Sequence, residues 1–85
     1  MPYRVSNHAR EEAQRRGIPM ELIQQVMASP GQIVAAHRGR NAYQSKVEID
    51  GALYLVRIIV ELGDPTSIIT VYRTSKIEKY WSSDE

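Results

Sequence analysis

The pattern of apolar and polar positions along the chain changes near Gly31. Before Gly31 the apolar residues recur at spacings of three and four, which is typical of helices, and after it they follow a period of two, which is typical of strands. The pattern therefore predicts an α+β fold. We expect two N-terminal helices packed on a three- to four-stranded antiparallel β-meander, which runs from about Gln32 to Thr74.

The first helix is expected over roughly Asn7 to Arg16. Ser6 is a natural N-cap, because its hydroxyl can accept a hydrogen bond from an unpaired amide of the first turn. Gly17 is a natural stop in the left-handed conformation. The apolar residues of this helix are Ala9 and Ala13, and this narrow stripe predicts a close approach to a flat surface.

The second helix is expected to open at Pro19 and to close before the Ser29-Pro30-Gly31 break. It supplies most of the helical part of the predicted core, through Ile18, Leu22, Ile23, Val26 and Met27. A short terminal helix, capped by Ser75, is predicted from Lys76 to Trp81. We expect it to pack over an edge of the sheet or onto a partner.

Four strands are predicted, at Gln32 to His37, Ala42 to Asp50, Ala52 to Leu62 and Ser67 to Thr74. Asp50-Gly51 is typical of a two-residue hairpin turn, because both positions tolerate positive φ. The next turn is expected at Gly63-Asp64-Pro65-Thr66.

These turns predict the register of both hairpins. If Ile49 opposes Ala52, the first hairpin pairs Tyr43 with Ile58, Ser45 with Val56, Val47 with Tyr54, Gln44 with Arg57 and Lys46 with Leu55. If Leu62 opposes Ser67, the second pairs Val60 with Ile69, Ile59 with Thr70, Ile58 with Val71 and Arg57 with Tyr72. Both registers place the same face under the helices. They leave an open face with Gln44, Arg57 and Tyr72 in a row.

Composition narrows the class of protein. A chain of 85 residues has room for one domain, 1–85, and the absence of cysteine excludes disulfides and thiolate metal sites. The two histidines are not spaced as metal ligands usually are, so the sequence predicts no metal site. No cofactor motif such as a glycine-rich phosphate loop is present. The polar N-terminus and the lack of a long apolar run predict a soluble, cytoplasmic protein without a membrane partner.

The candidate chemistry is that of binding an anionic phosphate. The groups suited to it are Arg57, Lys46 and Gln44 on the open face, Arg38 and Arg40 at the first hairpin, Tyr72, Thr74 and Lys76 at the end of the sheet, and His8 on the first helix. Metal-free RNA cleavage needs a base, an acid and cations. His8 is an acid or base suited to neutral pH, Arg57 can grip phosphate, and Tyr72 can donate a hydrogen bond or stack on a base.

Each of these residues also has an ordinary structural interpretation. A histidine near a helix start is often simply solvated, a tyrosine in a strand is often packed, and a charged hairpin loop is common. Convergence on one face is the reason to consider function.

The segments Ser6-Asn7-His8-Ala9 and Arg16-Gly17-Ile18 resemble the opening of a bacterial family known as domain of unknown function 4258. Thr70-Val71-Tyr72 resembles its last strand, and the similarity runs from Ser6 to about Trp81. That family is similar to toxins of the RelE, ParE and BrnT type, so the resemblance implies a RelE-like fold and metal-free RNA cleavage. It also implies an antitoxin partner, and it indicates His8 and Tyr72 as candidate site residues.

The chain departs from the family pattern at Glu12, where many relatives have a basic residue. Glu12 can form an acid/base pair with His8, four residues away, or a local side-chain contact.

Two functions remain open from the sequence. The first is a toxin-like, metal-independent endoribonuclease of a toxin-antitoxin system, acting on RNA or the ribosome. The second is a protein- or nucleic-acid-binding module without catalysis on the same fold. The net charge of +1 favours the second, because toxins that act on ribosomes tend to need a broad cationic surface.

Overall fold

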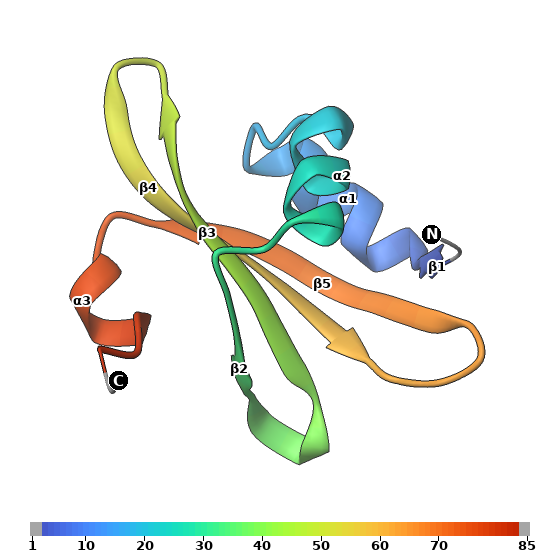
Figure 1. Ribbon diagram of the computed structural model, residues 1–85. Coiled ribbons are helices and arrows are strands. Elements are labelled where there is room, and N and C mark those ends of the chain that lie inside the picture. Colours follow the sequence, from blue (N-terminus) through green and yellow to red (C-terminus); the bar gives the residue numbers. More distant parts are fainter. Residues whose placement is uncertain (1–2, 84–85) are drawn as a thin grey trace.

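The computed structural model describes residues 3–83 and contains a five-stranded sheet with helices on both sides (Figure 1). In chain order the elements are β1 (Tyr3–Val5), α1 (Asn7–Arg15), α2 (Met20–Ala28), β2 (Gln32–Ala35), the 3₁₀ turn η1 (His37–Gly39), β3 (Asn41–Ile49), β4 (Ala52–Glu61), β5 (Thr66–Thr74) and α3 (Ile77–Tyr80). The strands are arranged in the order β1-β5-β4-β3-β2. The prediction of an α+β fold is confirmed.

Both N-terminal helices lie where the sequence predicts them. The hydroxyl of Ser6 caps α1 by accepting from the amide of Ala9 at 3.0 Å. Gly17 ends this segment in the left-handed conformation with φ of +67°. The second helix begins one residue later than predicted, because Pro19 is extended, with φ of −65° and ψ of 149°, and the first helical residue is Met20.

The predicted register of the first hairpin is confirmed along its whole length. Asp50 and Gly51 form the turn with φ of 52° and 82°, and Ile49 opposes Ala52. In this register Gln44 faces Arg57. Because the turn has only two residues, it fixes which residues of β3 and β4 face each other.

The register of the second hairpin is right in its centre and wrong near its turn. Arg57 faces Tyr72 as predicted, but Val60 pairs with Ile68 and not with Ile69, because a β-bulge follows Ile59. The bulge turns Ile68 into the core, where its side chain and that of Val60 are fully buried.

The expectation of a purely antiparallel meander is wrong at one edge. β1 pairs in parallel with the start of β5, so the sheet is mixed and has five strands. Ser6 adds a bond from its amide to the carbonyl of Ile68 at 3.1 Å. Three residues are too few to show a period of two, which is why the pattern did not predict this strand.

The first predicted strand is shorter than expected. β2 ends at Ala35, and the chain turns through η1, where Arg38 and Gly39 have φ of 61° and 73°. The amide of Ala36 donates to the carbonyl of Arg40 at 2.8 Å and closes this turn.

The apolar core lies between the sheet and the two N-terminal helices. Its buried members are Ala9, Ala13, Ile18, Ile23, Val26, Val56, Ile58, Val60, Ile68 and Val71. This agrees with the face that both predicted registers placed under the helices. Burial of these side chains supplies the main favourable contribution to folding.

The second face of the sheet is not open, which corrects the prediction. In Figure 1, α1 and α2 lie on one side of the sheet and α3 lies on the other. The exposed fraction is 0% for Gln44 and 8% for Arg57. The C-terminal segment therefore packs over the middle of this face and not over an edge. No helix within residues 3–83 is long and apolar enough to cross a membrane.

Candidate functional site

A row of four polar side chains crosses the second face of the sheet. Gln32 of β2 pairs with Gln44 of β3, Gln44 pairs with Arg57 of β4, and Arg57 pairs with Tyr72 of β5. Directly opposed residues share a face and lie close enough for their side chains to bind one another. We call these four residues the polar row.

Hydrogen bonds run along the whole polar row. Arg57 donates from Nε to Oε1 of Gln44 at 2.7 Å and from Nη1 to the hydroxyl of Tyr72. The amide nitrogen of Gln44 donates to Oε1 of Gln32 at 2.9 Å. No buried side-chain nitrogen or oxygen within residues 3–83 lacks a partner. Since a buried charge is costly unless it is hydrogen-bonded, this network is what allows Arg57 to lie inside the molecule.

The C-terminal segment covers the polar row by polar and aromatic contacts. The ring of Tyr80 lies 4.5 Å from the guanidinium of Arg57 and meets the ring of Tyr72 edge-on, with centroids 6.2 Å apart. The carbonyl of Tyr80 accepts from Gln44 at 3.2 Å. The amide of Ser82 donates to Gln32 at 3.1 Å, and Gln32 donates back to its carbonyl.

Trp81 anchors the same segment at the edge of the row. Nζ of Lys46 lies 4.3 Å from the centroid of its ring. The ring also packs against Gly31, where a Cβ atom would come within 3.1 Å of it. A side chain at position 31 would therefore crowd Trp81 and the carbonyl of Gln44, which lies 3.2 Å from that Cβ position.

A cavity of about 470 Å³ opens beside the polar row, between β4, β5, α3 and the η1 turn. We call it the arginine pocket, since it is lined by Arg38, Arg40, Arg57, His37, Tyr72 and Tyr80, together with Ala35, Ala36 and Ile59. Its lining residues include three arginines and no Asp or Glu. Glu61 reaches Arg40 at 3.5 Å from outside the lining. The pocket is therefore suited to an anion.

The structure brings together four of the residues that the sequence analysis singled out. Arg38, Arg40, Arg57 and Tyr72 line the arginine pocket. Gln44 lies in the network next to Arg57 but does not line the cavity.

The other candidates lie apart from the pocket. Lys46 binds Trp81, the hydroxyl of Thr74 accepts from the amide of Lys76 at 3.0 Å, and Lys76 is exposed. His8 is exposed on α1, on the opposite side of the sheet from Arg57.

Three residues of the site were missed by the sequence analysis. His37 precedes Arg38-Gly39-Arg40, so its position beside that basic turn was a usable signal. Gln32 faces Gln44 in a hairpin whose register we had not predicted. Tyr80 lies on the predicted terminal helix, but it reaches Arg57 because this helix packs over the middle of the sheet, whereas the sequence analysis placed it over an edge or on a partner.

Glu12 forms a local contact and not a pair with His8. Its carboxylate accepts from Arg15 at 2.7 Å and from Arg16 at 2.8 Å. The hydrogen bond from Arg15, and then that from Arg16, lowers the pKa of Glu12 from 4.5 to about 2. Both arginines are thus engaged on α1 and add nothing to the arginine pocket.

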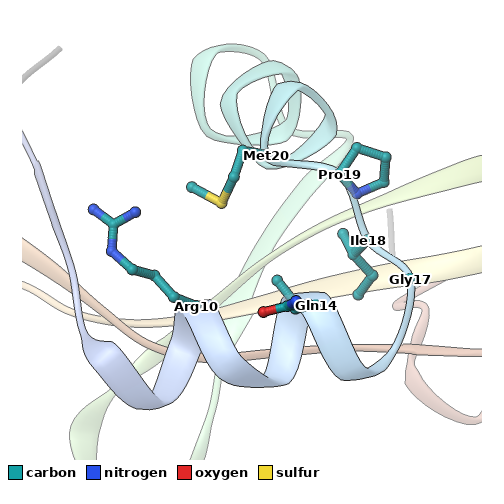
Figure 2. A pocket seen from close by; sticks show the side chains of 7 residues that line it. Arg10, Gln14, Gly17, Ile18, Pro19 and Met20 are labelled. Carbon is teal, nitrogen blue, oxygen red and sulfur yellow. The ribbon is translucent and has the colours of Figure 1, made fainter.

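A second cavity, of about 540 Å³, lies between α1 and α2. Figure 2 shows Arg10, Gln14, Ile18, Pro19 and Met20 around it. Arg10 is the one charged side chain in its lining, and no acid or base accompanies it. Among residues 3–83 there is also no group of three or more His, Asp or Glu side chains that could hold a metal ion. The arginine pocket is therefore the better candidate site.

Residues 5–73 match the family described as a domain of unknown function (DUF4258). The chain belongs to this family. The DUF4258 match includes the whole polar row and the η1 turn, and it ends before α3. Neither the curated proteins nor the solved structures contain a significant match to the chain. The segment that covers the polar row thus lies outside the part of the chain that identifies the DUF4258 family.

Proposed function

We propose that this DUF4258 protein is a toxin-like endoribonuclease that binds an RNA phosphate in the arginine pocket and cleaves the strand without a metal ion. The observation that supports the proposal is the convergence of Arg38, Arg40 and Arg57, with Tyr72, on one cavity without a lining carboxylate. Planar guanidinium groups match the geometry of phosphate oxygens and stabilise the negative charge that grows there during cleavage.

Arg57 is the fixed cation of the proposed site. Its Nε and Nη1 are held by Gln44 and Tyr72, so the guanidinium forms a rigid wall of the pocket. A preorganised donor needs no reorganisation when charge develops on the phosphate. Arg38 and Arg40 approach from the η1 turn and complete the cationic lining.

Tyr72 is suited to donate a proton. Its oxygen already accepts a hydrogen bond from Arg57, so its own O–H is free to point at an acceptor in the pocket. In RNA cleavage that acceptor is the leaving 5′-oxygen. Tyr72 therefore takes the role of the acid in the proposed reaction.

The resemblance to RelE, ParE and BrnT toxins supports RNA, free or on the ribosome, as the substrate. It also leads us to propose an antitoxin protein that covers the face carrying the pocket. An enzyme of this kind acts in the cytoplasm, where its RNA is found.

The test is induced expression, with growth and RNA fragments as readouts. We expect growth arrest, with fragments that end in a 2′,3′-cyclic phosphate. The double variant Arg38→Ala, Arg40→Ala should cleave at least ~100-fold more slowly, since it removes two of three transition-state cations. Arg10→Ala, an exposed arginine of α1, is the matched control and should cleave normally. Absence of cleavage by the wild type, with both free RNA and a translating extract, would overturn the proposal.

A second candidate function is RNA binding without cleavage. The surroundings of Arg57 favour this function, because Arg57 is 8% exposed and its guanidinium already donates hydrogen bonds to Gln44 and Tyr72. The net charge of +1 also favours it. Wild-type protein that binds RNA, loses this binding in the Arg38→Ala, Arg40→Ala variant and yields no fragments would establish the binding module.

A further inference from the structure

We propose that His37 is the general base of the arginine pocket and takes the proton from the 2′-hydroxyl of a bound RNA. This inference rests on the proposed function, and it replaces His8 in the role of the proton acceptor. His37 begins the η1 turn, has an exposed side chain and lines the same cavity as Arg57 and Tyr72.

The backbone fixes His37 at this place. The amide of Arg40 donates to the carbonyl of His37 at 3.2 Å, and the amide of Ala36 donates to the carbonyl of Arg40 at 2.8 Å. Arg38 adopts the left-handed conformation between them, with φ of 61°. The turn therefore holds His37 in the lining of the cavity by backbone hydrogen bonds that do not involve its imidazole.

The composition of the lining leaves His37 as the proton acceptor. Arginine stays protonated at every accessible pH, and tyrosine ionises near pH ~10. Histidine is the side chain that accepts and releases a proton between about pH 5 and 8. The charged and titratable groups around it are Arg38, Arg40, Arg57, Tyr72 and Tyr80, and Glu61 acts through Arg40.

The proposed step balances without a metal or a redox partner. Neutral His37 takes the proton of the 2′-hydroxyl while the 2′-oxygen forms a bond to phosphorus. The bond between phosphorus and the 5′-oxygen breaks, and that oxygen receives the proton of Tyr72. The products are a 2′,3′-cyclic phosphate and a 5′-hydroxyl. The imidazolium and the phenolate then return to their starting forms by proton exchange with water.

The test compares His37→Gln with His8→Gln in the full chain, on a short RNA oligonucleotide from pH 5 to 9. We expect His37→Gln to cleave ~100-fold or more slowly and to lose the rise in rate with pH, while RNA affinity stays within about twofold. His8→Gln, an exposed histidine on α1, should keep both the rate and the pH profile. In His37→Gly, added imidazole should restore part of the rate.

The outcomes separate this inference from the proposed function. A wild type that cleaves, together with a His37→Gln variant of unchanged rate and pH profile, would overturn the role of His37 alone. A His37→Gly variant that binds RNA but gains no rate from imidazole would do the same. A wild type that never cleaves would overturn the proposed ribonuclease, and the base with it.

Discussion

Gln44 is a buried amide on which three partners depend. It accepts from Arg57 and donates to Gln32 and to the carbonyl of Tyr80. We expect Gln44→Ala to lower the free energy of unfolding by about 1–3 kcal/mol, because Arg57 would keep a buried donor without an acceptor. Urea unfolding measures this. Gln25→Ala, on the exposed face of α2, should change it by less than about 0.5 kcal/mol. Equal effects would show that water can replace Gln44.

Glu12 makes the stability of the fold depend on pH, and the direction of this dependence follows from its lowered pKa. The pKa of Glu12 falls from 4.5 to about 2 in the folded chain, so the unfolded chain binds the proton first as the pH drops. The stabilisation is complete above about pH 5 and is lost between pH 4.5 and 2. We expect Glu12→Gln to be slightly less stable than the wild type at pH 7, because the ion pairs lie at the surface.

Thermal unfolding at pH 7, 4.5 and 2.5 tests this expectation. The difference in melting temperature between Glu12→Gln and the wild type should shrink over that series. Glu11→Gln is the control, since Glu11 forms no ion pair with residues 3–83. A difference that stays constant down to pH 2.5 would show that the pairs with Arg15 and Arg16 do not stabilise the fold.

Elements joined by tight turns were predictable from the sequence. The Asp50-Gly51 turn fixed the register of β3 and β4, and that register placed Gln44 against Arg57. The pattern failed where an element was too short or irregular to be periodic, as in β1 and at the bulge after Ile59. A periodic pattern needs several residues to become visible, so the three residues of β1 do not show one.

The residues of the candidate site also fall into those that the sequence predicts and those that it does not. Arg57 and Tyr72 were predictable because strand pairing aligns them. Arg38 and Arg40 were predictable as a basic turn, but the conformation of η1 decides that His37 joins them in the pocket. The C-terminal segment covers the polar row, and it contacts Gln44 through the carbonyl of Tyr80. These residues are far apart in sequence, so no local pattern predicts their contact.

Ser6 joins three elements, and its replacement should weaken all three together. Its hydroxyl accepts from the amide of Ala9 at 3.0 Å and donates to the carbonyl of Ile69 in β5 at 3.1 Å. We expect Ser6→Ala to cost about 1–2 kcal/mol, measured by urea unfolding, because the cap of α1 and the bond to β5 are lost together. Ser29→Ala, at the end of α2, removes no side-chain cap of that helix and should be nearly neutral. Equal stability of the two variants would show that the two hydrogen bonds of the Ser6 hydroxyl do not stabilise the fold.

At the scale of the whole molecule, the two faces of the sheet are covered in different ways. The helix side is an apolar core, and the other side is held by the polar row, the edge-on pair of Tyr72 with Tyr80, and cation–π contacts to Tyr72, Tyr80 and Trp81. Apolar burial is what makes unfolding cooperative, whereas a short terminal segment held mainly by polar contacts opens locally at lower cost. The C-terminal segment should therefore detach before the core unfolds.

Trp81 is the one tryptophan of the chain, and its fluorescence reports this detachment. We expect the urea midpoint seen by Trp81 fluorescence to lie at least about 0.5 M below the midpoint seen by far-UV circular dichroism, given a slope of about 1–3 kcal/mol per M. Gln32→Ala removes the bonds to Ser82 and should lower the fluorescence midpoint more than the dichroism midpoint. Coincident midpoints in both proteins would mean that cover and core unfold as one unit. Early detachment would instead uncover Gln44 and Arg57 while the sheet stays folded, so the row beside the arginine pocket would become accessible to a long RNA strand.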